Sequence, residues 1–133
     1  MGPVVVDASV ILGVLDPADT HHAESVRSMR LARSRGGRLV LPASAFAEVL
    51  VGSSRLGREA IRQTEAFVDT IVDLVYPIDR DVARVAAALR ARHRTLRLPD
   101  AMVLAVGRVT DSSAILTADS GWAGVDRRVK VVR

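Results

Sequence analysis

Short apolar runs alternate along the chain with longer stretches in which apolar residues recur at helical spacing. The apolar runs are rich in β-branched residues and too short for helices, which predicts five strands. These strands are expected at residues 3–7, 38–42, 73–78, 113–118 and 128–132. Strands that alternate with helices are typical of an α/β domain in which helices flank a mainly parallel central sheet. The length of 133 residues predicts a single domain over residues 1–133.

Capping residues and breakers mark the helices between these strands. Asp19 or Thr20 is expected to cap a helix that ends at about Arg35, before a glycine pair. Further helices are expected after Asp7, after Ser44, over residues 58–72, from Asp79 to about His93 and from Pro99 to about Val109. No repeat or linker divides the chain, so all of these elements are expected to share one core.

The aspartate of "PVVVDASVIL" interrupts the apolar pattern at the end of the first strand. Taken alone, Asp7 is best interpreted as the cap of the helix that follows. A parallel sheet, however, offers its ligand site at the carboxyl ends of the strands, which is where Asp7 falls. The interpretation of Asp7 therefore depends on the other acids of the chain.

Four acids each stand as the only charged residue of a long uncharged stretch. They are Asp7 in residues 1–15, Glu48 in residues 39–54, Asp100 in residues 98–107 and Asp119 in residues 112–125. Ionised carboxylates are rarely placed in apolar surroundings unless something compensates their charge. Four such acids in one small domain suggest a common purpose.

Asp100 and Asp119 also have simple structural interpretations. Asp100 follows Pro99 in the first turn of a helix, where the helix dipole favours an anion, and Asp119 lies in a plausible turn, "TADSGW". Glu48 lies about one turn inside its helix, too deep for a cap and among apolar neighbours, so it is expected to need a partner from elsewhere in the fold or a bound cation.

Adjacent first and fourth strands would bring the four acids together. Asp7 and Asp119 would then leave the sheet side by side, and the helices near Ser44 and Pro99 could direct Glu48 and Asp100 at the same crevice. Converging carboxylates raise one another's pKa, and the arrangement is best explained as a site for Mg²⁺, with Mn²⁺ as the alternative cation. Such a site suits phosphoryl transfer, because a metal there activates water and neutralises charge on a phosphodiester.

The charge balance agrees with a nucleic-acid substrate. The chain has 19 basic and 15 acidic residues, a net charge of +4, and without the four isolated acids its surface would carry about +8 around a negative pocket. A run of arginines at positions 90, 92, 94 and 97 is equally compatible with an RNA track and with a solvated helix end.

Cysteine usage and apolar run lengths exclude other classes. The chain has no cysteine, which excludes a disulfide scaffold and a zinc-thiolate site and favours a reducing compartment. Its apolar runs are too short to span a membrane and no signal peptide is visible, so a cytoplasmic protein is expected.

The segments "VVVDASV", "LPASAFAEVL", "LPDAMVLAVG" and "ILTADSGW", in this order over the whole chain, resemble the PIN-domain ribonucleases, and the size resembles the VapC-type toxins of toxin-antitoxin pairs. By this resemblance Asp7, Glu48, Asp100 and Asp119 match the acidic site residues of the family. Ser9 and Thr117 match its frequent hydroxyl positions. Some relatives carry a further acid after the last motif, where this chain has Gly121 and Trp122, so a second tightly held metal is not implied.

The resemblance implies catalysis by Asp7, Glu48, Asp100 and Asp119, with Asp7, Asp100 and Asp119 as ligands of Mg²⁺. It also implies an RNA substrate, a homodimer and a cognate antitoxin protein that lies over the active-site groove. A non-toxin nuclease of RNA processing and a non-enzymatic nucleic-acid-binding module remain alternatives.

Two other α/β enzymes and a histidine nuclease fit the sequence less well. A receiver-like module needs two adjacent acids after strand one, but Ala8 follows Asp7, and a haloacid-dehalogenase-type phosphatase needs an aspartate where Ser9 stands. The three histidines lie in polar helical stretches, which favours exposed rather than catalytic positions.

Overall fold

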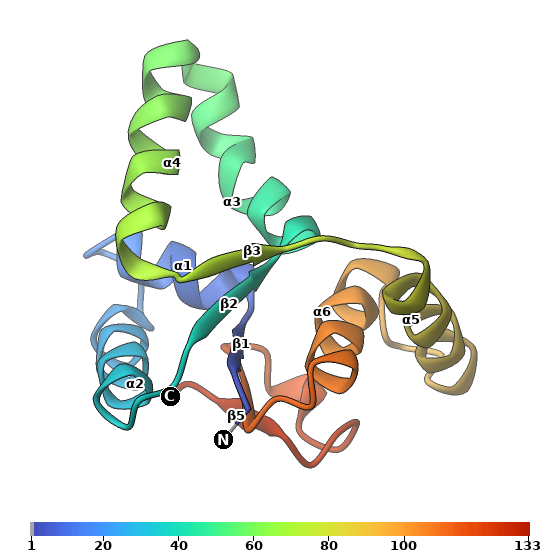
Figure 1. Cartoon of the computed structure of the whole chain (residues 1–133). Helices are drawn as coiled ribbons and strands as arrows, with labels where there is room; N and C mark the ends of the chain where they lie inside the picture. Colours follow the sequence, from blue (N-terminus) through green and yellow to red (C-terminus); the bar gives the residue numbers. More distant parts are fainter. Residues whose placement is uncertain (1) are drawn as a thin grey trace.

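The structure is a computed structural model that describes residues 2–133, and its centre is one parallel sheet of five strands (Figure 1). The strands are β1 (Val4–Val6), β2 (Leu39–Pro42), β3 (Leu74–Tyr76), β4 (Ala114–Thr117) and β5 (Val129–Val131). They are arranged in the order β3-β2-β1-β4-β5, and every neighbouring pair is parallel. The predicted fold class and all five predicted strands are therefore confirmed.

Within residues 2–133, six α-helices and a short 3₁₀ helix connect the strands. They are α1 (Ala8–Leu15), α2 (His22–Ser34), α3 (Ala43–Leu56), α4 (Arg58–Ile71), α5 (Arg80–Arg92), α6 (Leu98–Val109) and η1 (Ser120–Trp122). Figure 1 shows α1 and α2 on one side of the strands and α5 and α6 on the other. This two-sided cover explains why the strands consist almost entirely of apolar residues rather than alternating ones.

The central strand β1 is buried on both faces. Val5 and Val6 are fully buried, and Val5 lies opposite Val40 of β2 and Ile115 of β4. The backbone N–H of Asp7 donates to the carbonyl of Leu116 at 2.9 Å and so extends this pairing beyond the end of β1. The adjacency of the first and fourth strands, on which the predicted site depends, is confirmed.

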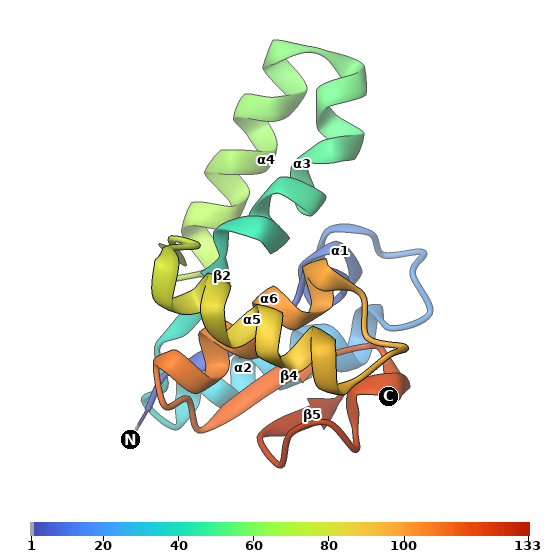
Figure 2. The same ribbon diagram turned by 90° about the vertical axis from the view of Figure 1, so that its right-hand side faces the viewer.

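The hairpin of α3 and α4 extends beyond the carboxyl edge of the sheet as an arm (Figures 1 and 2). The two helices meet at Gly57, whose φ of 111° lies in the region that favours glycine. Three large apolar side chains of the arm are exposed: Val51, Leu56 and Phe67. The base of α3 stays in the core through Ala45 and Val49.

Helix boundaries follow the sequence signals with one exception. Asp79 caps α5, because its Oδ1 accepts a hydrogen bond from the N–H of Val82 at 3.0 Å. The predicted cap of α2 is wrong: the helix begins at His22, and the carboxylate of Asp19 accepts instead from the N–H of His21 at 2.7 Å. The side chain of Asp19 thus closes a local turn, and this hydrogen bond replaces the capping bond. Within the described chain, no helix is long and apolar enough to cross a membrane.

The contact between α6 and β4 leaves no room for a side chain at position 107. A Cβ added to Gly107 would lie 2.7 Å from Cγ1 of Ile115 and closer still to its Cδ1. We expect Gly107→Ala to destabilise the protein by about 1–3 kcal/mol, the usual cost of overpacking a core, measured by chemical denaturation.

Gly52→Ala in α3 is the matched control. Nothing lies within 4 Å of a Cβ at Gly52, so the same substitution should stabilise the protein by up to about 1 kcal/mol through helix propensity. Equal effects of the two substitutions would contradict the close approach of α6 to β4.

Candidate active site

Asp7 is held at the carboxyl end of β1 by two hydroxyl groups. Its Oδ2 accepts hydrogen bonds from Ser9 Oγ at 2.7 Å and from Thr117 Oγ1 at 3.0 Å. Asp7 occupies the N-cap position of α1 without making a side-chain cap hydrogen bond. Asp7 thus stands at the N-cap position that its sequence predicts, but its carboxylate does not cap the helix. It is bound instead by side chains from α1 and β4.

The same two hydroxyls also fix the chain that leaves β4. Ser9 Oγ accepts from the N–H of Ala118 at 3.0 Å, and Thr117 Oγ1 accepts from the N–H of Asp119 at 3.1 Å. Each hydroxyl thus donates to Asp7 and accepts from the backbone after β4. This network sets the position of Asp119 relative to Asp7.

Burial keeps the charge of Asp7 unfavourable in spite of these hydrogen bonds. The side chain is buried, and this desolvation raises the pKa of Asp7 above its ordinary value. The hydrogen bonds from Ser9 and Thr117 favour the ionised form and act against the rise, while repulsion by Asp100 adds to it. Asp7 therefore carries a charge that the fold itself compensates only in part.

Glu48 faces the same edge from the first half of α3. Partial burial raises its pKa, repulsion by Asp7 and Asp100 raises it further, and the charge of Arg97 opposes the rise. The expectation that apolar neighbours enclose Glu48 is wrong, since its residue surface is exposed. The apolar residues beside it in sequence, such as Ala47 and Val51, lie on the exposed side of the helix as well.

Asp100 lies in the first turn of α6 and is nearly buried, with 12% of its side chain exposed. Arg97 contacts both of its oxygens, from Nε to Oδ2 at 3.2 Å and from Nη2 to Oδ1 at 3.3 Å. The bond to Asp100 raises the pKa of Arg97, and the charges of Glu48 and Asp119 add to the rise.

Asp119 lies at the rim of the site. Its Oδ1 accepts from the N–H of Gly121 at 2.8 Å and caps η1, so the predicted turn is confirmed. Asp119 and Asp100 line the same hollow of about 550 Å³, which Arg92, His93 and Trp122 also line.

The structure thus gathers the four acids at one edge but does not assemble them into a finished metal site. Asp7, Glu48 and Asp100 repel one another, and Asp119 joins them through the charge of Arg97. No group of three acids or histidines within residues 2–133 is arranged closely enough to hold a metal ion. The donors are nevertheless carboxylate oxygens, which Mg²⁺ and Mn²⁺ prefer, and their excess negative charge fits a cation.

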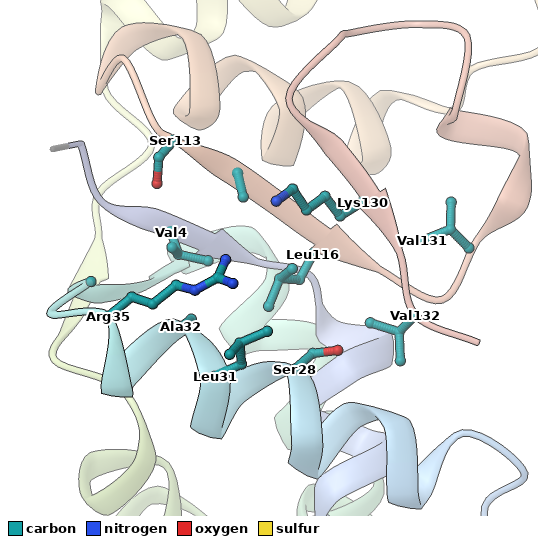
Figure 3. Close-up of a pocket in the computed structure, with 12 residues that line it drawn as sticks. Val4, Ser28, Leu31, Ala32, Arg35, Ser113, Leu116, Lys130, Val131 and Val132 are labelled. Carbon is teal, nitrogen blue, oxygen red and sulfur yellow. The ribbon is translucent and has the colours of Figure 1, made fainter.

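A second cavity, of about 370 Å³, lies away from these acids, between α2 and strands β1, β4 and β5 (Figure 3). Its walls are largely apolar, with Val4, Leu31 and Leu116 among them. Arg35, at the end of α2, and Lys130 of β5 lie on opposite sides of it. None of the predicted site residues lines this cavity, so the candidate active site is the carboxyl edge of the sheet.

Arg97 is the site residue that sequence reasoning did not single out. In the sequence it belongs with the surface arginines, because the uncharged stretch around Asp100 begins one residue after it. The signal was its spacing: on a helix, residues three apart lie on the same side and can pair.

Comparison with known proteins agrees with this geometry. The PIN domain family model matches residues 4–128. Ribonuclease VapC13 of Mycobacterium tuberculosis is 29% identical over 122 residues, which cover 90% of this chain and 92% of that protein. A toxin-antitoxin complex from Klebsiella pneumoniae (19% identity, TM-score 0.78) and VapBC2 from Rickettsia felis bound to a promoter DNA fragment (7% identity, TM-score 0.79) share the fold over 98% of each chain. With four acids at the carboxyl edge of a β3-β2-β1-β4-β5 sheet and a family match over nearly its whole length, this chain belongs to the PIN domain family.

Proposed function

We propose that this protein is a Mg²⁺-dependent endoribonuclease and the toxin of a toxin-antitoxin pair. The observation that carries the proposal is the convergence of Asp7, Glu48 and Asp100 at the carboxyl edge of the sheet, where Asp7 and Asp100 are buried and the charges act on one another. A fold gains no stability from such an arrangement, so it is best explained by a cation and a reaction that need it. The similarity to a protein named as a VapC ribonuclease supports RNA as the substrate.

Asp7, Asp100 and Asp119 are the residues that would hold Mg²⁺ or Mn²⁺. The ion would supply a Lewis acid that activates water and neutralises charge on the phosphodiester. Ser9 and Thr117 orient Asp7 through the hydrogen bonds described above, and Thr117 also fixes the backbone of Asp119. These two hydroxyls are positioning groups rather than reacting ones.

Glu48 is the acid best suited to take the proton of the attacking water. It is partly open to solvent and its pKa is raised, which brings it closer to the working pH of a general base. In the proposed reaction the water oxygen bonds to phosphorus and the bond from phosphorus to the 3′ oxygen breaks. Glu48 receives the water proton, a proton from solvent goes to the 3′ oxygen, and the products carry 5′-phosphate and 3′-hydroxyl ends.

The proposed partners are RNA, a cognate antitoxin and a second copy of the chain, in the cytoplasm and without a membrane. Structural neighbours of this chain include toxin-antitoxin complexes, which supports the antitoxin. The exposed apolar residues of the arm, Val51, Leu56 and Phe67, support self-association.

The direct test is cleavage of total RNA by the purified protein with Mg²⁺ and with excess EDTA, followed by mapping of the product ends. We expect Mg²⁺-dependent cleavage with 5′-phosphate and 3′-hydroxyl ends. Asp7→Asn should reduce the rate by at least about 100-fold, the scale on which loss of one charge-stabilising group slows an enzyme.

Asp16→Asn is the matched control, because Asp16 is an exposed acid whose carboxylate accepts a hydrogen bond from the N–H of Ala18, two residues later in the chain. It should cleave like the parent. Full activity in EDTA, or products with 2′,3′-cyclic phosphate, would contradict the proposed mechanism.

The stability of Asp7→Asn separates a functional acid from a structural one. Because the pKa of Asp7 is raised in the folded protein, its stabilising contribution is complete only below the unfolded pKa of about 3.9 and is lost as the pH rises through the folded pKa. In EDTA at pH 7 the variant should therefore melt at a higher temperature than the parent. This difference should shrink as the pH falls toward 4.

In Mg²⁺ the parent should melt at a higher temperature than Asp7→Asn, since only the parent gains stability from binding the ion. Thermal melts in EDTA and in Mg²⁺ give both results. A variant that is less stable than the parent in EDTA at pH 7 would show that Asp7 serves the fold and not a metal site.

Expression in the native host tests the toxin assignment. We expect the protein to co-purify with an antitoxin and, when expressed without it, to slow growth in the parent but not in Asp7→Asn. Free expression without a partner and without a growth defect would contradict the toxin assignment while leaving the nuclease assignment intact.

A further inference from the structure

Arg97 contacts the acid cluster from outside, at the N-cap position of α6. Its backbone is extended there, and its guanidinium turns back to bind both oxygens of Asp100. The two side chains differ in exposure, with 72% for Arg97 and 12% for Asp100. A solvent-exposed cation thus covers a nearly buried carboxylate.

This contact puts Arg97 in competition with any metal ligand role of Asp100. Each carboxylate oxygen already accepts a hydrogen bond from the guanidinium, so a cation that binds Asp100 meets an adjacent positive charge and has to share the carboxylate with it. The charge of Arg97 also interacts with the charges of Glu48 and Asp119. The guanidinium therefore supplies positive charge to three of the four acids.

We propose that Arg97 is a built-in counter-ion of the acid cluster, which neutralises Asp100 while the metal site is empty and is displaced when a divalent cation binds. The inference rests on the proposed function, because it needs Asp100 to be a metal ligand. It makes Arg97 a positioning residue that sets metal affinity, and it predicts that this chain binds its metal less tightly than the acids alone would allow.

The structure allows Arg97 to leave without disturbing the helix. α6 begins with no side-chain cap, and the bond that starts it runs from the N–H of Ala101 to the backbone carbonyl of Arg97 at 3.0 Å. Since most of the Arg97 side chain is already hydrated, turning it outward exposes little new surface. Exposed ion pairs are weak, so a divalent cation can outcompete this one.

The test is calorimetric titration of the EDTA-stripped full-length protein with Mn²⁺ alone, at fixed ionic strength. We expect Arg97→Gln to bind Mn²⁺ about three- to tenfold more tightly than the parent, because both the competitor and its positive charge are gone. Arg97→Lys keeps the charge but not the two-pronged contact, so its affinity should lie between the two.

Arg94→Gln is the matched control for charge alone. Arg94 lies three residues before Arg97 and lines the hollow that Asp100 and Asp119 also line, but it has no ion pair with any of residues 2–133. Its substitution should change Mn²⁺ affinity less than twofold. Arg97→Gln binding no more tightly than the parent, or tightening no more than Arg94→Gln, would overturn the proposal.

Thermal unfolding gives a second readout that does not depend on activity. Without metal, Arg97→Gln should melt below the parent, because Asp100 has lost its counter-ion. In saturating Mn²⁺ the variant should gain more than the parent. A variant that is destabilised equally in both conditions would mean that Arg97 serves only the fold, and would overturn the proposal.

Failure of the inference and failure of the proposed function are distinguishable in the same titration. If the parent binds Mn²⁺ and Asp7→Asn does not, the metal site stands and the Arg97 variants decide the inference alone. If the parent does not bind Mn²⁺, or binds it no better than Asp7→Asn does, the proposed metal site is wrong and the inference about Arg97 is wrong with it.

Discussion

The parallel pairing of β1 with β4 is the constraint on which the site depends. It places Asp7 next to Thr117, 110 residues later in the chain, and it continues past the strand ends through the bond from the N–H of Asp7 to the carbonyl of Leu116. Ser9 and Thr117 then tie the start of α1 to the chain after β4. A shift of one residue in this register would direct every side chain of β4 to the opposite face and separate the two hydroxyls from Asp7.

The four acids at this edge are compensated in four different ways. Asp7 takes hydroxyl hydrogen bonds, Asp100 takes a guanidinium, Asp119 takes a backbone N–H, and Glu48 keeps contact with solvent. Each acid is therefore tolerated by its own local arrangement. None of these arrangements neutralises the edge as a whole, and burial, together with repulsion from neighbouring acids, keeps the pKa values of Asp7 and Glu48 raised.

Much of the fold could be predicted because it follows from local pattern. Runs of β-branched residues predict the strands, and the isolation of four acids in uncharged stretches predicts the candidate site. The environment of each acid could not be predicted in the same way. Glu48 sits among apolar residues in sequence, but Ala47 and Val51 are exposed, since the core side of α3 is set by Ala45 and Val49.

Arg97, the partner of Asp100, cannot be found from the charge pattern that singles out Asp100. Counting charges along the sequence placed Arg97 just outside an uncharged stretch, whereas a helix brings residues three apart onto one side. The cap of α2 failed for a related reason, because Asp19 satisfied a nearer backbone N–H first. The metal ligands, the cation and the catalytic role of Glu48 stay predictions.

The burial pattern of α3 divides this helix into a fixed part and a projecting part. Glu48, the sixth of the 14 residues of α3, lies between Ala45 and Val49, whose burial holds the base of the helix in the core. At 1.5 Å per residue the last residue of α3 lies about 10 Å beyond Val49. A tilt of the arm about this anchored base would therefore move the exposed Leu56 at the tip and leave Glu48 in place beside Asp7 and Asp100. The arm can adapt to whatever binds its tip without misplacing the proposed proton acceptor.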